Sequence, residues 1–189
     1  MRLFASLLTM LAECVTSRLS HRWLPVIFSS VLILTASQAS AQVIRTDEPD
    51  FLVLGAGAFD INDDMTAGEF DAQFRLNTRL WIFRPQVGLF VTTDAGFYAY
   101  AGFYSDFHLG DSFVLSPSIS VGGFHEGDGK DLGGAVEFRS AVELAYKFEN
   151  KARLGLQFGH LSNASIYDSN PGEEFLILNY SIPVTVFDR

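Results

Sequence analysis

Cysteine is almost absent from this 189-residue chain, whose single copy is Cys14. One cysteine alone cannot form an internal disulfide or a thiolate metal site. The chain also lacks an apolar run near the ~20 residues that a membrane-spanning helix needs. Basic residues are scarce, with 13 lysines and arginines against 22 aspartates and glutamates, which gives a net charge of −9. Such an acidic balance argues against nucleic acid as a partner.

The first 41 residues are expected to form a cleaved secretory signal peptide. Residues 24–36 (LPVIFSSVLILTA) are apolar, follow basic residues, and precede a small-x-small cleavage site that ends at Ala41. This run is too short to span a membrane. Cleavage would remove Cys14, three arginines and one glutamate, leaving 10 basic and 21 acidic groups and a net charge of −11. The mature chain, residues 42–189, has a length that suits one domain.

Alternation with a period of two runs through the mature chain, and no helical period of useful length occurs. In residues 69–80, apolar side chains occupy one face while Asp71, Arg75 and other polar residues occupy the opposite face. Residues 137–148 repeat this arrangement, with Glu143 and other charges on the second face. Charges of both signs can pair inside a narrow lumen. The pattern therefore favours strands that turn apolar side chains outward and polar ones inward, as in a transmembrane barrel.

The sequence predicts an all-β fold, an eight-stranded antiparallel transmembrane β-barrel. An even number of strands allows a single bacterial chain to close without free edges in lipid. Short links near 81–83, 110–112 and 149–151 are expected to be periplasmic turns, whereas 61–67, 125–135 and 163–173 are expected to be external loops. The link at Asp94-Ala95 is a short exception. The predicted strands span 51–61, 68–80, 84–93, 96–109, 113–124, 136–148, 152–162 and 174–187.

Two alternatives remain open for the fold and its loops. A soluble β-sandwich or lipocalin-like barrel would bury the apolar face, and the aromatic stretch 96–104 fits either fold because both of its faces are apolar or aromatic. Residues 125–131 (HEGDGKD) resemble an oxygen-rich calcium loop, but they lack regular ligand spacing and contain Lys130, which opposes a cation. A solvated loop is the preferred interpretation, and we expect no metal and no cofactor.

The stretch 159–175 contains the residue types of an acyl-transferring hydrolase, namely His160, Ser162 and Glu174. A serine nucleophile, a histidine base and an orienting carboxylate form an acyl-enzyme together. His160 and Ser162 share the outward face of a predicted strand, separated by about 6.6 Å of strand rise. Glu174 heads an aliphatic stripe on the next strand, where a carboxylate needs a partner and His160 is at hand. The competing interpretation is that these residues merely lie at the headgroup boundary.

Strand direction places this stretch on one side of the membrane. If both termini of an eight-stranded barrel are periplasmic, the seventh strand rises to the outer surface and the eighth descends from it. His160, Ser162 and Glu174 would then face the outer leaflet. A hydrolase at this position would meet an acylated lipid, which in a bacterial outer membrane means lipopolysaccharide.

The motif HLSNASIYDSNPGEEF resembles the H-x-S-N and N-P-G-x-E signature of the outer-membrane lipid A 3-O-deacylases, the PagL type that is grouped with acyloxyacyl hydrolases. Similarity extends to residues 54–64 and 127–150. The resemblance implies that Ser162 is the nucleophile, His160 the general base and Glu174 the acid that orients it. It also implies that Asn163 and the backbone amides near Ala164 and Ser165 form the oxyanion hole. Members of that family often carry glycine in place of Ser165.

The function expected from this resemblance is a serine esterase of the outer membrane. It would remove the 3-hydroxyacyl chain esterified at position 3 of lipid A, with lipid A or lipopolysaccharide as its substrate in the outer leaflet. A non-enzymatic small barrel that stabilises the membrane or binds a partner is the main alternative, and an acyltransferase is a minor one. A homodimer is left open.

Overall fold

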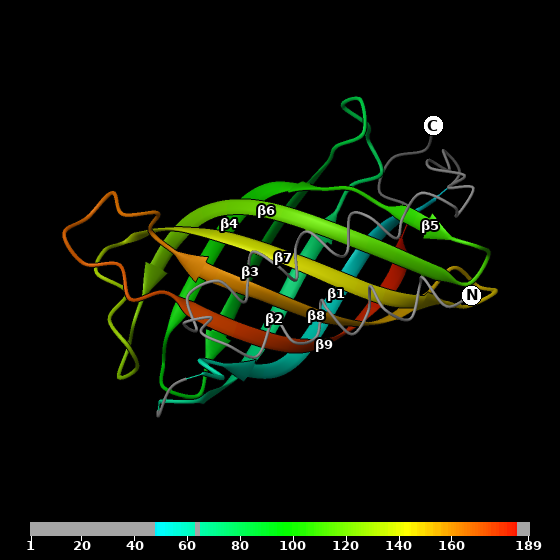
Figure 1. The fold of residues 1–189 in the computed structure, drawn as a ribbon. Coiled ribbons are helices and arrows are strands. Elements are labelled where there is room, and N and C mark those ends of the chain that lie inside the picture. Colours follow the sequence, from blue (N-terminus) through cyan, green and yellow to red (C-terminus); the bar gives the residue numbers. More distant parts are fainter. Residues whose placement is uncertain (1–47, 63–64, 185–189) are drawn as a thin grey trace, which may run out of the picture. The chain divides into compact units, whose positions relative to one another are not determined.

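The computed structural model describes residues 48–62 and 65–184, so the predicted signal peptide lies outside the described residues. Nine antiparallel strands follow one another in the order β4-β3-β2-β1-β9-β8-β7-β6-β5, and an additional pairing of β4 with β6 closes the sheet into a barrel (Figure 1). Within these residues, no helix is long and apolar enough to span a membrane. The strands are β1 Asp50–Phe59, β2 Ala67–Arg75, β3 Arg84–Thr92, β4 Phe97–Tyr104, β5 Phe107–Leu109, β6 Phe113–His125, β7 Val136–Lys147, β8 Arg153–Ser162 and β9 Glu173–Val184.

Strands β4 and β5 are two parts of one barrel strand, interrupted at Ser105 and Asp106. Both parts pair with β6 in the same register. At the break, the Ser105 amide donates to the Pro117 carbonyl over 3.0 Å. Proline has no N–H and cannot return a ladder bond, so the regular pairing stops there. The barrel therefore has eight strand positions, and the predicted eight-stranded antiparallel fold is confirmed.

Strand β2 is shorter than predicted, because it ends at Arg75 rather than at residue 80. One further bond continues the ladder with β3, from the Leu76 amide to the Pro85 carbonyl over 3.0 Å. The chain then bonds to residues at or just before the start of β1. The Asn77 backbone amide donates to the Asp50 carboxylate over 2.6 Å, and the Asn77 side-chain amide donates to the Glu48 carbonyl. The Asp50 carboxylate thus binds a backbone amide that alternation alone assigned to a strand ladder.

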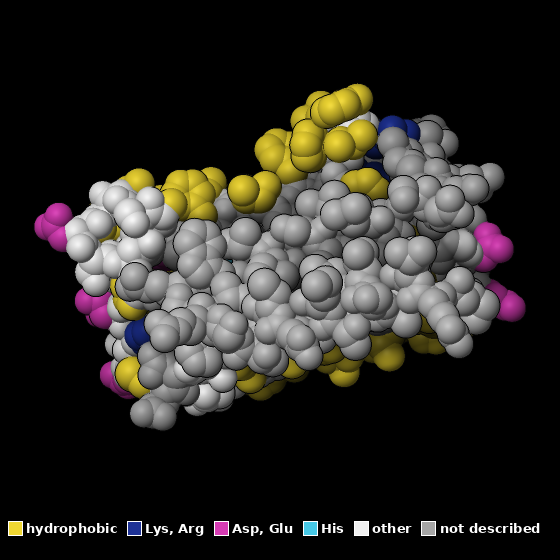
Figure 2. Space-filling view, viewed as in Figure 1, with side chains coloured by type: hydrophobic (Ala, Val, Ile, Leu, Met, Phe, Trp, Pro, Cys, Tyr) yellow, Lys and Arg dark blue, Asp and Glu magenta, His cyan; other side chains and the backbone are white. Residues whose placement is uncertain are grey.

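Polar side chains fill the barrel and apolar side chains cover it. Asp71, Arg75 and Glu143 are buried, as the alternation predicted. The soluble alternative, with the apolar face inside, is therefore wrong. Stretch 96–104 is divided between the faces, with its tyrosines buried and its phenylalanines outside. Figure 2 shows apolar side chains along the flanks and acidic ones at the two ends. Exposed apolar residues include Leu54, Phe70, Val87, Leu89, Ile119, Val121, Leu144, Leu156, Leu178 and Tyr180.

Ion pairs hold the middle of the lumen together. The Arg75 guanidinium meets the two carboxylate oxygens of Glu143 at 3.3 and 3.0 Å, and the Asn179 amide donates to the same carboxylate over 2.7 Å. Arg139 donates to Asp71 over 3.3 Å and stacks 4.2 Å from the centre of the Phe175 ring. Each of these four charged side chains has a partner of opposite charge, which offsets the cost of burying it.

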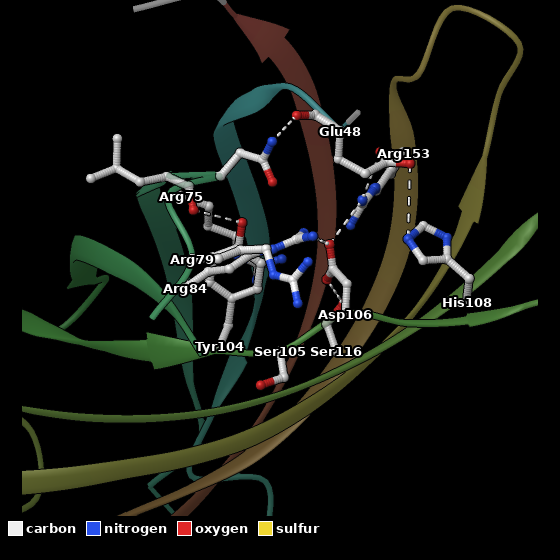
Figure 3. A network of polar contacts seen from close by, with 12 residues as sticks. Glu48, Arg75, Arg79, Arg84, Tyr104, Ser105, Asp106, His108, Ser116 and Arg153 are labelled. Atoms are coloured by element: carbon white, nitrogen blue, oxygen red, sulfur yellow. Dashed lines mark hydrogen bonds and ion pairs between the residues drawn. The ribbon is translucent and has the colours of Figure 1, made fainter. Parts of the chain in front are cut away.

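A second network occupies the end of the barrel near the residue 110–112 turn (Figure 3). The Arg153 guanidinium bonds to Glu48 at 3.1 Å and to Asp106 at 3.0 Å, while Arg84 also bonds to Asp106, at 2.9 Å. Lys147 lies 2.9 Å from Glu48. Burial alone would raise the pKa of the Glu48 carboxyl, but Lys147 and Arg153 hold that pKa below its usual value. This end of the lumen is thus closed by cross-linked charges.

Candidate active site

The three proposed catalytic side chains lie at the end of the barrel that carries the loops after β1, β6 and β8, hereafter the loop end. Strand β8 rises to this end and finishes at Ser162, and β9 leaves it from Glu173. The register of β8 with β9 places His160 directly opposite Glu174. Two residues that are 14 positions apart in the chain therefore become cross-strand neighbours. Side chains of directly opposed residues on one face of a sheet are close enough to interact.

A direct contact joins His160 to Glu174. The imidazole Nδ1 lies 3.2 Å from Glu174 Oε1, and the side chains are 43% and 32% exposed. A carboxylate at Nδ1 accepts the N–H of that nitrogen and so fixes the tautomer in which Nε2 carries the free electron pair. The arrangement gives His160 the form that a general base requires.

Ser162 follows His160 on the same face of β8 and is half-buried. Within the described residues, no hydrogen bond joins the Ser162 hydroxyl to the His160 imidazole. Catalytic hydrogen bonds are often long without substrate and tighten in the substrate complex. The backbone places Ser162 and His160, the proposed nucleophile and base, on one face of β8.

Asn163 organises the loop that follows the serine. Its buried side-chain amide donates to the carbonyls of Leu132 and Ser169, each over 2.7 Å, and its side-chain oxygen accepts the Ser165 amide at 3.0 Å. The Asn163 carbonyl also accepts the amide of Ile166, which closes a tight turn. Asn163 therefore connects the loop after β8 to the loop after β6.

The two residues inside this turn have left-handed backbone conformations. Ala164 has a φ of 53° and Ser165 a φ of 61°. A turn with two positive φ angles strains residues that carry a Cβ, which is why glycine is favoured at such positions. The glycine that often replaces Ser165 in the resembling family would relax this turn, and the serine retains the same shape at some cost in strain.

Asn62 is a contact of the site that the sequence did not indicate. Its side-chain amide donates to Glu174 Oε2 over 2.9 Å, while Oε1 of the same carboxylate faces His160. Asn62 belongs to the loop after β1, more than a hundred positions from Glu174 in the sequence. Neither alternation nor motif spacing indicates this contact between the loop after β1 and the first residues of β9.

The structure shows why position 172, the third residue of the N-P-G segment, is a glycine. Its φ is +70°, and a Cβ at this position would lie 2.8 Å from Cε1 and 3.2 Å from Nε2 of His160. Ordinary contacts of such atoms are about 3.5–4.0 Å. The backbone of Gly172 thus lies against the imidazole edge, leaving no room for a side chain.

A shallow groove of about 260 Å³ runs from His160 along the outside of the barrel. Small residues on β7 and β8 create the hollow, and a valine and a phenylalanine border it. Such a surface accepts an aliphatic chain and offers few groups that would bind a polar ligand. Its lining consists of Ser118, Ser140, Ala141, Val142, Phe158, Gly159 and His160.

Comparison with known proteins places residues 57–183 within a sequence profile described as lipid A 3-O-deacylase (PagL). A curated relative, the lipid A deacylase PagL of Bordetella bronchiseptica, is 30% identical over 74 residues. That alignment covers 38% of this chain and 42% of the relative, so the match spans less than half of the relative's length.

A solved structure shares the barrel architecture. The crystal structure of the outer membrane enzyme PagL superposes with a TM-score of 0.55 at 23% identity, covering 71% of this chain and 99% of that one. A structure described as de novo design of transmembrane β-barrels has a TM-score of 0.47 at 11% identity, covering 72% and 98%. The first of these supports the closed barrel fold.

Proposed function

The chain belongs to the lipid A 3-O-deacylase (PagL) family, and we propose that it removes the ester-linked 3-hydroxyacyl chain at position 3 of lipid A. This family is one of hydrolases of the outer membrane, and a barrel with an apolar exterior fits that location. The observation that carries the proposal is the contact of His160 with Glu174, with Ser162 on the same outward face.

The proposed reaction proceeds through an acyl-enzyme. His160 Nε2 takes the Ser162 proton as the serine oxygen forms a bond to the ester carbonyl carbon. Collapse of the tetrahedral intermediate breaks the bond from that carbon to the sugar oxygen, which receives the proton from His160. Water, deprotonated by His160, then attacks the acyl-serine and releases the 3-hydroxy fatty acid. Glu174 stabilises the imidazolium in both halves.

The oxyanion of each intermediate needs hydrogen-bond donors in fixed positions. We assign this support to Asn163, Ala164 and Ser165. Asn163 contributes by building the turn, because its side-chain N–H groups are already bonded to Leu132 and Ser169. The Ser165 amide is also bonded, to Asn163. Within the described residues no acceptor is bonded to the Ala164 amide, so we assign this amide the role of donor to the developing negative charge.

The outward position of the site suits a substrate that is held in lipid. In the proposed orientation the loop end is extracellular, so His160, Ser162 and Glu174 meet the outer leaflet, where lipid A resides. The groove beside His160 would receive the acyl chain, while the sugar stays at the level of the loops. Reaction in this arrangement requires no extraction of the lipid from the membrane.

Mass spectrometry of lipid A from a Gram-negative host tests the proposal. Cells that express the protein should lose one 3-hydroxyacyl unit from lipid A, and cells expressing Ser162→Ala should not. A Ser112→Ala variant, which alters a serine in the turn at the opposite end of the barrel, should retain the reaction and serves as the matched control. Unchanged lipid A with a folded wild-type barrel would favour the non-enzymatic barrel, and a transferred acyl chain on another lipid would identify an acyltransferase.

A further inference from the structure

The Glu174 carboxylate has two partners on its two oxygens. His160 Nδ1 lies 3.2 Å from Oε1, and the Asn62 side-chain amide donates to Oε2 over 2.9 Å. We propose that Asn62 is a positioning residue, which holds the Glu174 carboxylate in the orientation that directs Oε1 at His160. This inference rests on the proposed function, because it assigns Asn62 a role through the carboxylate of the triad.

The loop that carries Asn62 is fastened to β9 on both sides of the carboxylate. The Ile61 amide donates to the backbone carbonyl of Glu174 over 3.1 Å. Asp60, which is buried, lies 3.5 Å from the Lys130 ammonium, and the same ammonium lies 3.6 Å from Glu173. Three loop-end segments are thus joined through Lys130. Asn62 therefore approaches Glu174 from an anchored backbone.

A second partner matters because the carboxylate is only partly enclosed. The Glu174 side chain is 32% exposed, and glutamate has several rotatable bonds that water-facing groups explore freely. A donor on Oε2 removes that freedom while leaving Oε1 for the imidazole. Hydrogen bonds to charged groups are stronger than neutral ones, and solvent screening reduces this benefit at the surface. Loss of the donor should lower kcat by about tenfold.

Two substitutions at Asn62 distinguish the effect of its amide N–H donor from the effect of its side-chain shape. Asn62→Ala removes the amide, and Asn62→Asp keeps the shape but replaces the donor with a second carboxylate. With purified, folded protein and lipid A in detergent, we expect kcat to fall about tenfold for the alanine variant and further for the aspartate variant, with little change in KM. Wild-type kcat in both variants would overturn the proposal.

Thr66→Ala is the matched control for loop order. The Thr66 hydroxyl donates to the Asp60 carbonyl over 2.9 Å within the same loop, and this bond does not involve Glu174. This variant should keep kcat within about twofold of wild type, since the carboxylate keeps its donor. A loss in Thr66→Ala equal to that in Asn62→Ala would mean that loop order alone matters, and the positioning role would be wrong.

A double-mutant cycle shows whether Asn62 acts through Glu174. In a Glu174→Ala background, Asn62→Ala should cause no further loss of kcat, because the group that it positions is gone. Equal losses in both backgrounds would contradict the inference. Failure of the proposed function would give a different result, because full activity in Ser162→Ala or Glu174→Ala would rule out the proposed triad. Wild-type activity of Asn62→Ala, with Ser162→Ala inactive and Glu174→Ala active but impaired, would exclude only the role of Asn62.

Discussion

Gly172→Ala should disable the site by displacing His160 without dismantling the barrel. The new Cβ would stand 2.8 Å from Cε1 of the imidazole, so the ring must retreat by about half an ångström or more to reach ordinary contact. That movement displaces both ring nitrogens from their present positions, including Nδ1 from its contact with Glu174. Misplacement of a reacting group by about 1 Å can cost on the order of 10²-fold in rate. We therefore expect kcat for lipid A hydrolysis to fall by roughly that factor.

Gly110→Ala is a closely matched control for backbone strain. Gly110 has the same φ of +70°, but a Cβ there would meet nothing within 4 Å, and it lies at the opposite end of the barrel. Both alanine variants should lose about 1–2 kcal/mol of unfolding free energy from the left-handed conformation. Only Gly172→Ala should lose activity. If the two variants retained equal kcat in the folded state, the contact between Gly172 and His160 would have no catalytic consequence, and the reasoning would be refuted.

Three further predictions concern the lumen and the loop. Glu143→Ala leaves the buried Arg75 charge without its main partner and should lower the unfolding free energy by about 3–5 kcal/mol. The double variant Arg75→Met with Glu143→Leu should lower the unfolding free energy by less, because it leaves no unpaired charge. Urea unfolding in detergent measures both effects. Because the pKa of Glu48 is depressed in the folded state, its stabilising effect is present above its usual pKa of 4.5 and is lost as the pH falls through the folded-state pKa. Glu48→Gln should therefore flatten the dependence of melting temperature on acid pH, and an unchanged profile would contradict this assignment. Asn163→Ala removes three side-chain bonds of the loop after β8, so it should lower kcat and increase proteolysis near residue 165; an intact loop with lower activity would instead indicate a direct role at the oxyanion.

Alternation was sufficient to predict the barrel because each face of a strand has one environment. Asp71, Arg75 and Glu143 could be placed inside from parity alone, and the structure buries all three. Parity also put His160 and Glu174 on one outward face, and their cross-strand contact follows from the register. Local periodicity is enough for this placement, because shifting a strand by one residue would move each of its side chains to the opposite face of the sheet.

Contacts between loops could not be predicted in this way. The bond from Asn62 to Glu174 depends on how the loop after β1 folds over β9, and the contact of Gly172 with His160 depends on a left-handed backbone. The early end of β2 has the same origin. In each of these cases the contacting residue lies in a segment that is distant in the sequence or irregular in structure. The alternation of residues along a single strand does not indicate such a contact.

The role of Ser162 as nucleophile is tested by comparing purified, folded wild-type protein with Ser162→Ala on isolated lipid A. Mass spectrometry should find that the wild-type protein releases one 3-hydroxy fatty acid per lipid A and leaves a free hydroxyl at position 3. Ser162→Ala, with the same heat-modifiable mobility of a folded barrel, should leave lipid A intact. Release of the same fatty acid by the folded Ser162→Ala variant would contradict the account, because the reaction would then proceed without the proposed nucleophile.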